Sequence, residues 1–97
     1  MNLLSMQKFA GVAGESFDLM MGASAMPLTL VQVSPLATRP APGQVRQPFS
    51  LLFQSASQIV LPQKIYSLRN ASLGSMGMFL VPIGRAPQGV TYQAVFN

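Results

Sequence analysis

The chain has no histidine, cysteine or tryptophan, and its 97 residues include only two carboxylates, Glu15 and Asp18. General acid–base catalysis most often uses His, Asp, Glu, Lys, Tyr or Cys, and protein metal sites need His, Cys or clustered carboxylates. On a strand, residues three apart lie on opposite faces, so Glu15 and Asp18 do not form a catalytic pair. We therefore expect a protein that is not an enzyme and that needs no metal or cofactor.

Charge is also scarce, since charged residues make up 8% of the chain against about 25% in an ordinary domain. The net charge of +4 comes from basic residues that are scattered singly, whereas nucleic-acid binders cluster Lys and Arg on one face. So few charges leave much of the exterior neutral or apolar, and large exposed apolar patches mark interaction sites. We expect self-association or a protein partner, and neither a nucleic-acid partner nor a small-molecule substrate.

Long apolar runs are absent, because Gly, Pro or polar residues interrupt each one well before the roughly 18 residues that a membrane-spanning helix requires. Lys8 falls too late for the basic region of a signal peptide. These features predict no membrane span and no secretory signal. The expected location is the cytoplasm or an assembled particle.

The pattern of β-forming segments predicts one all-β domain over residues 1–97. Short segments of β-forming residues alternate with turns. The predicted strands are 15–21, 27–33, 49–53, 64–69, 76–83 and 90–96, with a short apolar return at 59–61. We expect residues 3–10 to form a short helix, with Leu3, Met6 and Ala10 on one side. The resulting fold is a small antiparallel β-barrel or sandwich of six to seven strands with a short N-terminal helix.

Alternation along these strands predicts the core. In the strand 64–69, for example, Tyr66 and Leu68 face one way while Ile65 and Ser67 face the other. The strand 76–83 is the most apolar and is expected to be central. The predicted core residues are Phe17, Leu19, Leu28, Leu30, Phe49, Leu51, Phe53, Tyr66, Leu68, Phe79, Val81, Tyr92 and Phe96.

Two features provide candidate interaction residues. The segment 34–48 is rich in proline and carries Arg39 and Arg46, which favours either a contact arm with these arginines as polar anchors or a plain mobile connection. Methionine is abundant, with seven residues, and Met-rich surfaces often bind partners, although Met also fills gaps in cores. We take Met20 and Met26 as the candidate methionines.

Other motifs have ordinary explanations. Aromatic residues on the strands are typical of a stacking platform for single-stranded nucleic acid, but equally of a β core, and the basic residues form no track beside them. The sequence Asn70-Ala-Ser72 matches a glycosylation sequon but, without a secretory signal, is expected to form a turn, followed by Gly74 in a left-handed conformation.

Several segments also resemble a known family. They are Phe49-Ser-Leu-Leu-Phe53, Leu61-Pro-Gln63 with Tyr66, Leu73-Gly74, Phe79-Leu-Val-Pro-Ile-Gly84 and Tyr92-Gln-Ala-Val-Phe-Asn97. In this succession the chain resembles, from about Phe9 to Asn97, a family of short bacterial proteins classed as a domain of unknown function. The resemblance implies an accessory protein associated with phage-tail-collar or microcystin-dependent proteins, and it supplies no catalytic residues.

Together these observations predict a non-enzymatic structural or accessory subunit of a protein assembly, phage-tail-like or fibre-associated, that acts through apolar surface contacts. The alternative is a small binding module for a peptide, a glycan or single-stranded nucleic acid.

Overall fold

Six strands and one helix form the regular structure of residues 6–36 and 48–96, the part of the chain that the computed structural model describes. The elements follow one another as α1 (Met6–Ala10), β1 (Ser16–Met21), β2 (Ser24–Pro35), β3 (Phe49–Ser55), β4 (Lys64–Asn70), β5 (Gly74–Ala86) and β6 (Gly89–Phe96). The predicted all-β fold with a short N-terminal helix is confirmed. The apolar stretch 59–61, predicted as a short return strand, is irregular instead.

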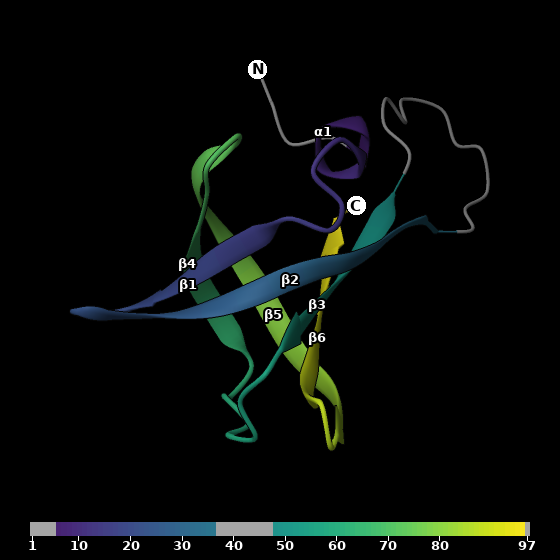
Figure 1. Cartoon of the computed structure of the whole chain (residues 1–97). Coiled ribbons are helices and arrows are strands. Elements are labelled where there is room, and N and C mark those ends of the chain that lie inside the picture. The colour runs from purple at the N-terminus through teal and green to yellow at the C-terminus, as the bar shows by residue number, and fades with distance from the viewer. Residues whose placement is uncertain (1–5, 37–47, 97) are drawn as a thin grey trace.

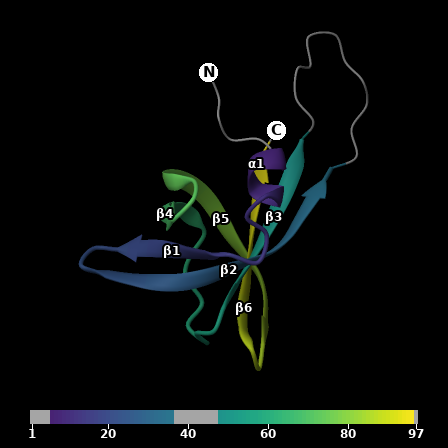
Figure 2. The same ribbon diagram turned by 45° about the horizontal axis from the view of Figure 1, so that its top comes forward.

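The strands form a closed antiparallel barrel in the order β1-β2-β3-β6-β5-β4 (Figure 1). β1 and β2 form a hairpin, in which Met21 lies opposite Ser24. β2 and β3 are also neighbours, and their pairing ends at Pro35 and Phe49. The predicted irregular segment 34–48 therefore begins too early, because Ser34 and Pro35 belong to β2. Its residues 37–47 lie outside the described part of the chain. Figure 2 shows the β1–β2 and β5–β6 hairpins extending from the barrel in different directions.

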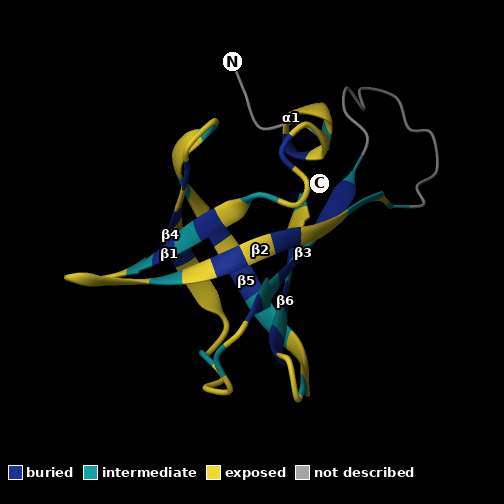
Figure 3. Cartoon of the chain, viewed as in Figure 1, coloured by how far each residue is buried: buried dark blue, intermediate teal, exposed yellow. Residues whose placement is uncertain are grey.

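The core lies inside the barrel and follows the alternation of the strands, which Figure 3 shows clearly along β2. Side chains on the inner face are buried because successive Cβ atoms of a strand point to opposite sides. Ten of the predicted core residues are buried: Phe17, Leu19, Leu28, Leu30, Phe49, Leu51, Phe53, Tyr66, Leu68 and Tyr92.

The predicted phase of β5 is wrong. Phe79 is exposed and Val81 is half-buried, whereas Met78 and Leu80 face the core. Both faces of β5 are apolar at these positions, so alternation alone does not select the inner one. The register with β4 selects it, because Met78 lies opposite the inward-facing Tyr66. In the closed barrel, moreover, β5 is no more central than the other strands.

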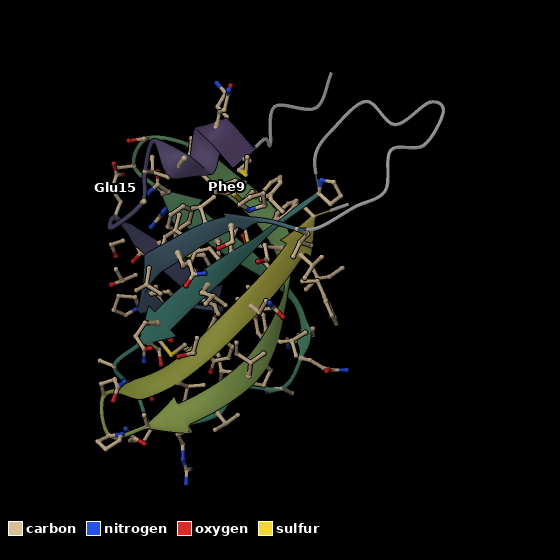
Figure 4. All side chains as sticks on the ribbon, turned by 90° about the vertical axis from the view of Figure 1, so that its right-hand side faces the viewer. Phe9 and Glu15 are labelled. Carbon is tan, nitrogen blue, oxygen red and sulfur yellow. The ribbon has the colours of Figure 1, made fainter. Side chains whose placement is uncertain are left out.

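Helix α1 covers one end of the barrel and contributes Phe9 to the core. Phe9 is fully buried, and its ring centroid lies 5.5 Å from that of Phe96 and 5.9 Å from that of Phe49. Figure 4 shows Phe9 below the helix, on the side of the strands. Of the residues predicted to share one side of the helix, Met6 packs partly buried against the core and Ala10 is exposed, while Leu3 lies outside the described residues. A helix of five residues is too short for periodicity to identify Phe9 as its buried residue.

Phe96 closes the same end, although it is less buried than predicted. It is half-buried, and its ring stacks on that of Phe49 with centroids 4.9 Å apart. The aromatic rings of α1, β3 and β6 therefore seal the barrel at the end where the helix lies. Val12, Val90 and Ala94 complete the core and were not predicted.

The turn between β4 and β5 is organised by Asn70, whose side chain is buried. Its Nδ2 atom donates to the Ser16 carbonyl at 3.0 Å and to Glu15 Oε1 at 3.3 Å. Its Oδ1 atom accepts from the backbone N–H groups of Ser72 and Leu73. The predicted turn is thus confirmed, and Gly74 has the positive φ, 81°, that was expected of it.

Replacing Asn70 with alanine is expected to lower the free energy of unfolding by about 2–3 kcal/mol, because the Ser16 carbonyl and two turn N–H groups lose their partner. Urea denaturation followed by circular dichroism measures the change. Ser75→Ala, at an exposed position on β5, is the control and should have almost no effect. Equal stability of the Asn70 variant would contradict this role.

Candidate binding groove and apolar patch

The barrel closes through a short seam between β1 and β4. Only two pairs connect these strands, Asp18 with Arg69 and Leu19 with Leu68. If the same antiparallel register continued, Met20 would lie opposite Ser67 and Met21 opposite Tyr66. The two strands instead separate there, and these four residues line a groove.

The groove has a volume of about 420 Å³, within the roughly 300–1,000 Å³ of typical ligand sites. Its lining residues are Met20, Met21, Gly22, Leu61, Pro62, Lys64, Ile65, Tyr66 and Ser67. Among these described residues, Lys64 alone carries a charge. Its Nζ atom lies 5.2 Å from the centroid of the Tyr66 ring, where the ring attracts the cation.

The irregular segment 56–63 supplies one wall of the groove, and two buried tyrosines hold it in place. The Leu61 N–H donates to the Tyr92 hydroxyl at 3.1 Å, and the Tyr66 hydroxyl donates to the Pro62 carbonyl. At the start of the segment, Gln58 Nε2 donates to the carbonyls of Ala86 and Pro87. The position of Leu61 and Pro62 is therefore fixed by the barrel itself.

Burial raises the pKa of the Tyr66 phenol above its ordinary value of 10.0, and the nearby Tyr92 raises it further. The folded chain thus keeps the phenolic proton at pH values where the unfolded chain has lost it. The protonated phenol therefore contributes fully to the free energy of unfolding at pH values below its pKa in the unfolded chain, which is about 10. This contribution is lost as the pH rises from there through the pKa of Tyr66 in the folded chain.

We expect unfolding free energy to fall with pH above about 10 more steeply in the wild type than in Tyr66→Phe, which has no phenol at this position. Urea denaturation at a series of alkaline pH values measures the difference. Ultraviolet titration should show the Tyr66 phenol ionising later than free tyrosine. Identical pH profiles for the two proteins would contradict the inferred environment.

An apolar patch lies beside the groove on the outer face of β4 and β5. We define the β4–β5 patch as Ile65, Phe79 and Val81. Ile65 and Phe79 are directly opposite each other in the register and are 70% and 50% exposed. The outward position of Ile65 agrees with the alternation of β4, whereas Phe79 and Val81 were predicted to lie in the core.

The candidate interaction residues have different positions. Met20 lines the groove, and Met26 is half-buried and packs against the core. Arg39 and Arg46 lie outside the described residues. The sequence did not reveal the groove itself, because its two sides come from strands that are far apart along the chain.

Most of the aromatic rings on the strands are enclosed in the core. Phe49, Phe53, Tyr66 and Tyr92 are buried, whereas the ring of Phe79 is exposed.

The carboxylate of Glu15 accepts hydrogen bonds from Asn70 and Ser72, and Figure 4 shows Glu15 at the edge of the molecule.

The structure brings together no set of side chains suited to hold a metal ion among the described residues. Within residues 6–36 and 48–96, His, Cys, Asp and Glu form no group of three that could hold a metal ion. The helix found in this same part of the chain lacks the length and apolar character needed to cross a membrane.

Comparison with known proteins places this barrel in a family. The model of that family matches residues 4–96, nearly the whole chain. The chain belongs to the family described as Domain of unknown function (DUF6916). The resemblance to a domain of unknown function is thereby confirmed. No curated protein and no solved structure matches the chain.

Proposed function

We propose that the protein is a non-enzymatic structural or accessory subunit that binds other copies of itself through the β4–β5 patch. The observation that carries this proposal is the pairing of Ile65 and Phe79 on the outer face of the barrel, where both are largely exposed. Covering these two side chains contributes about 2–3 kcal/mol per copy. An interface formed from the same patch on both copies obtains this contribution twice.

The scarcity of charge supports the same conclusion. Ser67 and Gly77 lie opposite each other next to the Ile65–Phe79 pair, so the neighbouring pair adds no charge to be desolvated on contact. Because the barrel is closed, most strand edges are already paired. Self-association therefore depends on this face rather than on strand edges.

We further propose that the assembly is phage-tail-like or fibre-associated. This placement is supported only by the resemblance of the chain to accessory proteins near phage-tail-collar proteins. We also propose that the protein is located in the cytoplasm or in an assembled particle.

Sedimentation equilibrium tests the proposal with the double variant Ile65→Ser/Phe79→Ser. Wild-type protein should associate, and the double variant, which loses the contribution on both copies, should associate about a thousandfold more weakly or worse. Val31→Ser is the matched control, since Val31 is 52% exposed on β2, outside the patch. Circular dichroism confirms that each variant is folded.

A wild type that stays monomeric at high micromolar concentration would overturn the proposal. Equal weakening by Val31→Ser would overturn the assignment to the β4–β5 patch.

A further inference from the structure

We propose that the groove between β1 and β4 binds an extended acidic–apolar peptide segment of another protein, which adds as a strand along the open edge of β4. β5 pairs with β4 over its whole length, from Lys64 to Asn70. β1 pairs only with Leu68 and Arg69. In the described part of the chain, residues 64–67 therefore have a strand neighbour on one side only, and the groove lies on the other side.

The backbone of this edge specifies the conformation of the ligand. In an antiparallel ladder, the N–H and C=O groups of every second residue point to the same side. Two of residues 64–67 therefore direct both groups into the groove. An extended peptide satisfies such groups by strand addition, in which main-chain hydrogen bonds provide affinity and alternate side chains provide specificity.

The shape of the groove favours a single peptide strand over the edge of a second barrel. The diverging end of β1 forms one side, and Leu61 and Pro62, fixed by the two tyrosines, form another. Beyond the seam the β1–β2 hairpin continues away from the barrel (Figure 2). If a second barrel paired with this edge, its other strands would clash with the β1–β2 hairpin. A single extended segment has no other strands and can lie in the groove.

The lining residues specify the side chains of that segment. Met20, Met21, Leu61 and Ile65 favour apolar residues at alternate positions. Lys64, the charged residue of the described lining, favours Asp or Glu at a neighbouring position, and its attraction to the Tyr66 ring holds it at the groove. The net charge of +4 also favours approach of an acidic segment. The groove shares Ile65 with the β4–β5 patch, but peptide binding does not require self-association.

The experiment uses the full chain and a fluorescein-labelled peptide, Val-Thr-Val-Glu-Val-Thr-Val, as the probe. Fluorescence anisotropy should show saturable binding. Hydrogen exchange by NMR should show slower exchange, by about tenfold or more, for two amides among residues 64–67. Amides of β3, which is paired on both sides, serve as the reference and should not change.

Two N-methylated versions of the peptide test the backbone pairing. One version carries methyl groups on the amide nitrogens of the odd-numbered residues, and the other on those of the even-numbered residues. Each version therefore lacks the N–H donors along one side of the extended peptide. One version should bind about tenfold more weakly or worse, and the other should bind like the parent peptide. Equal binding by both versions would overturn strand addition.

Charge variants test the chemistry of the ligand. Lys64→Glu should weaken binding by about threefold to tenfold, while Arg85→Glu, an identical charge change outside the groove lining, should have little effect. No saturable binding of the parent peptide, or equal effects of the two variants, would overturn the proposal. The Ile65→Ser/Phe79→Ser comparison, made without peptide, reports separately on the proposed function.

Discussion

Replacing Gly89 with alanine is expected to destabilise the fold by about 3–5 kcal/mol, combining backbone strain with steric overlap. Gly89 has a φ of 134°, which side-chain-bearing residues rarely adopt. A Cβ atom there would lie 1.8 Å from the Ser55 carbonyl oxygen and 2.7 Å from the Ser55 carbonyl carbon. Because both are backbone atoms, the β5–β6 hairpin would have to move away from the end of β3.

Urea denaturation measures this effect, and Gly84→Ala is the matched control. Gly84 is on the same hairpin, but a Cβ atom there meets nothing within 4 Å. The control should therefore differ from the wild type by less than about 1 kcal/mol, since only strand propensity changes. If the Gly89 variant were as stable as the Gly84 variant, the close contact with Ser55 would be contradicted.

Truncating Phe53 to alanine is expected to cost about 3–5 kcal/mol, typical of a buried phenylalanine. Phe53 is fully buried, and its ring meets that of Phe17 edge-on with centroids 5.2 Å apart. The loss would be a large part of the stability of a small domain, which totals about 5–15 kcal/mol.

Phe79→Ala is the matched control for Phe53→Ala. The same atoms are removed, but Phe79 is half exposed on the outer face of β5, so the cost should be about 1 kcal/mol. Chemical denaturation of the two variants under dilute conditions provides the comparison. The reverse order of stabilities would mean that the phase of β5, and with it the β4–β5 patch, is wrong.

The sequence predicted the fold best where polar residues mark the outer face of a strand. In β1, Ser16 and Asp18 alternate with Phe17 and Leu19, and the buried residues are those predicted. In β5, apolar residues occupy both faces, so the correct phase depends on pairing with β4. That register is a tertiary property and leaves no local pattern.

The candidate site could be predicted only in part for a related reason. Met20 was a candidate, and it lines the groove. The groove itself exists because β1 and β4, separated by two other strands in the sequence, pair at two positions and then diverge. Similarly, Phe9 belongs to the core because α1 folds over the end of the barrel, which a five-residue helix does not indicate by its own pattern.

An NMR concentration series of the wild type tests whether the outer face of β4 and β5 is a contact surface between copies. We expect signals of the Ile65 methyl groups and the Phe79 ring to shift progressively as the protein concentration rises, while signals of the Val31 methyl groups, which are also exposed, do not shift. Shifts confined to Val31, or no change in any signal up to high micromolar concentration, would contradict it.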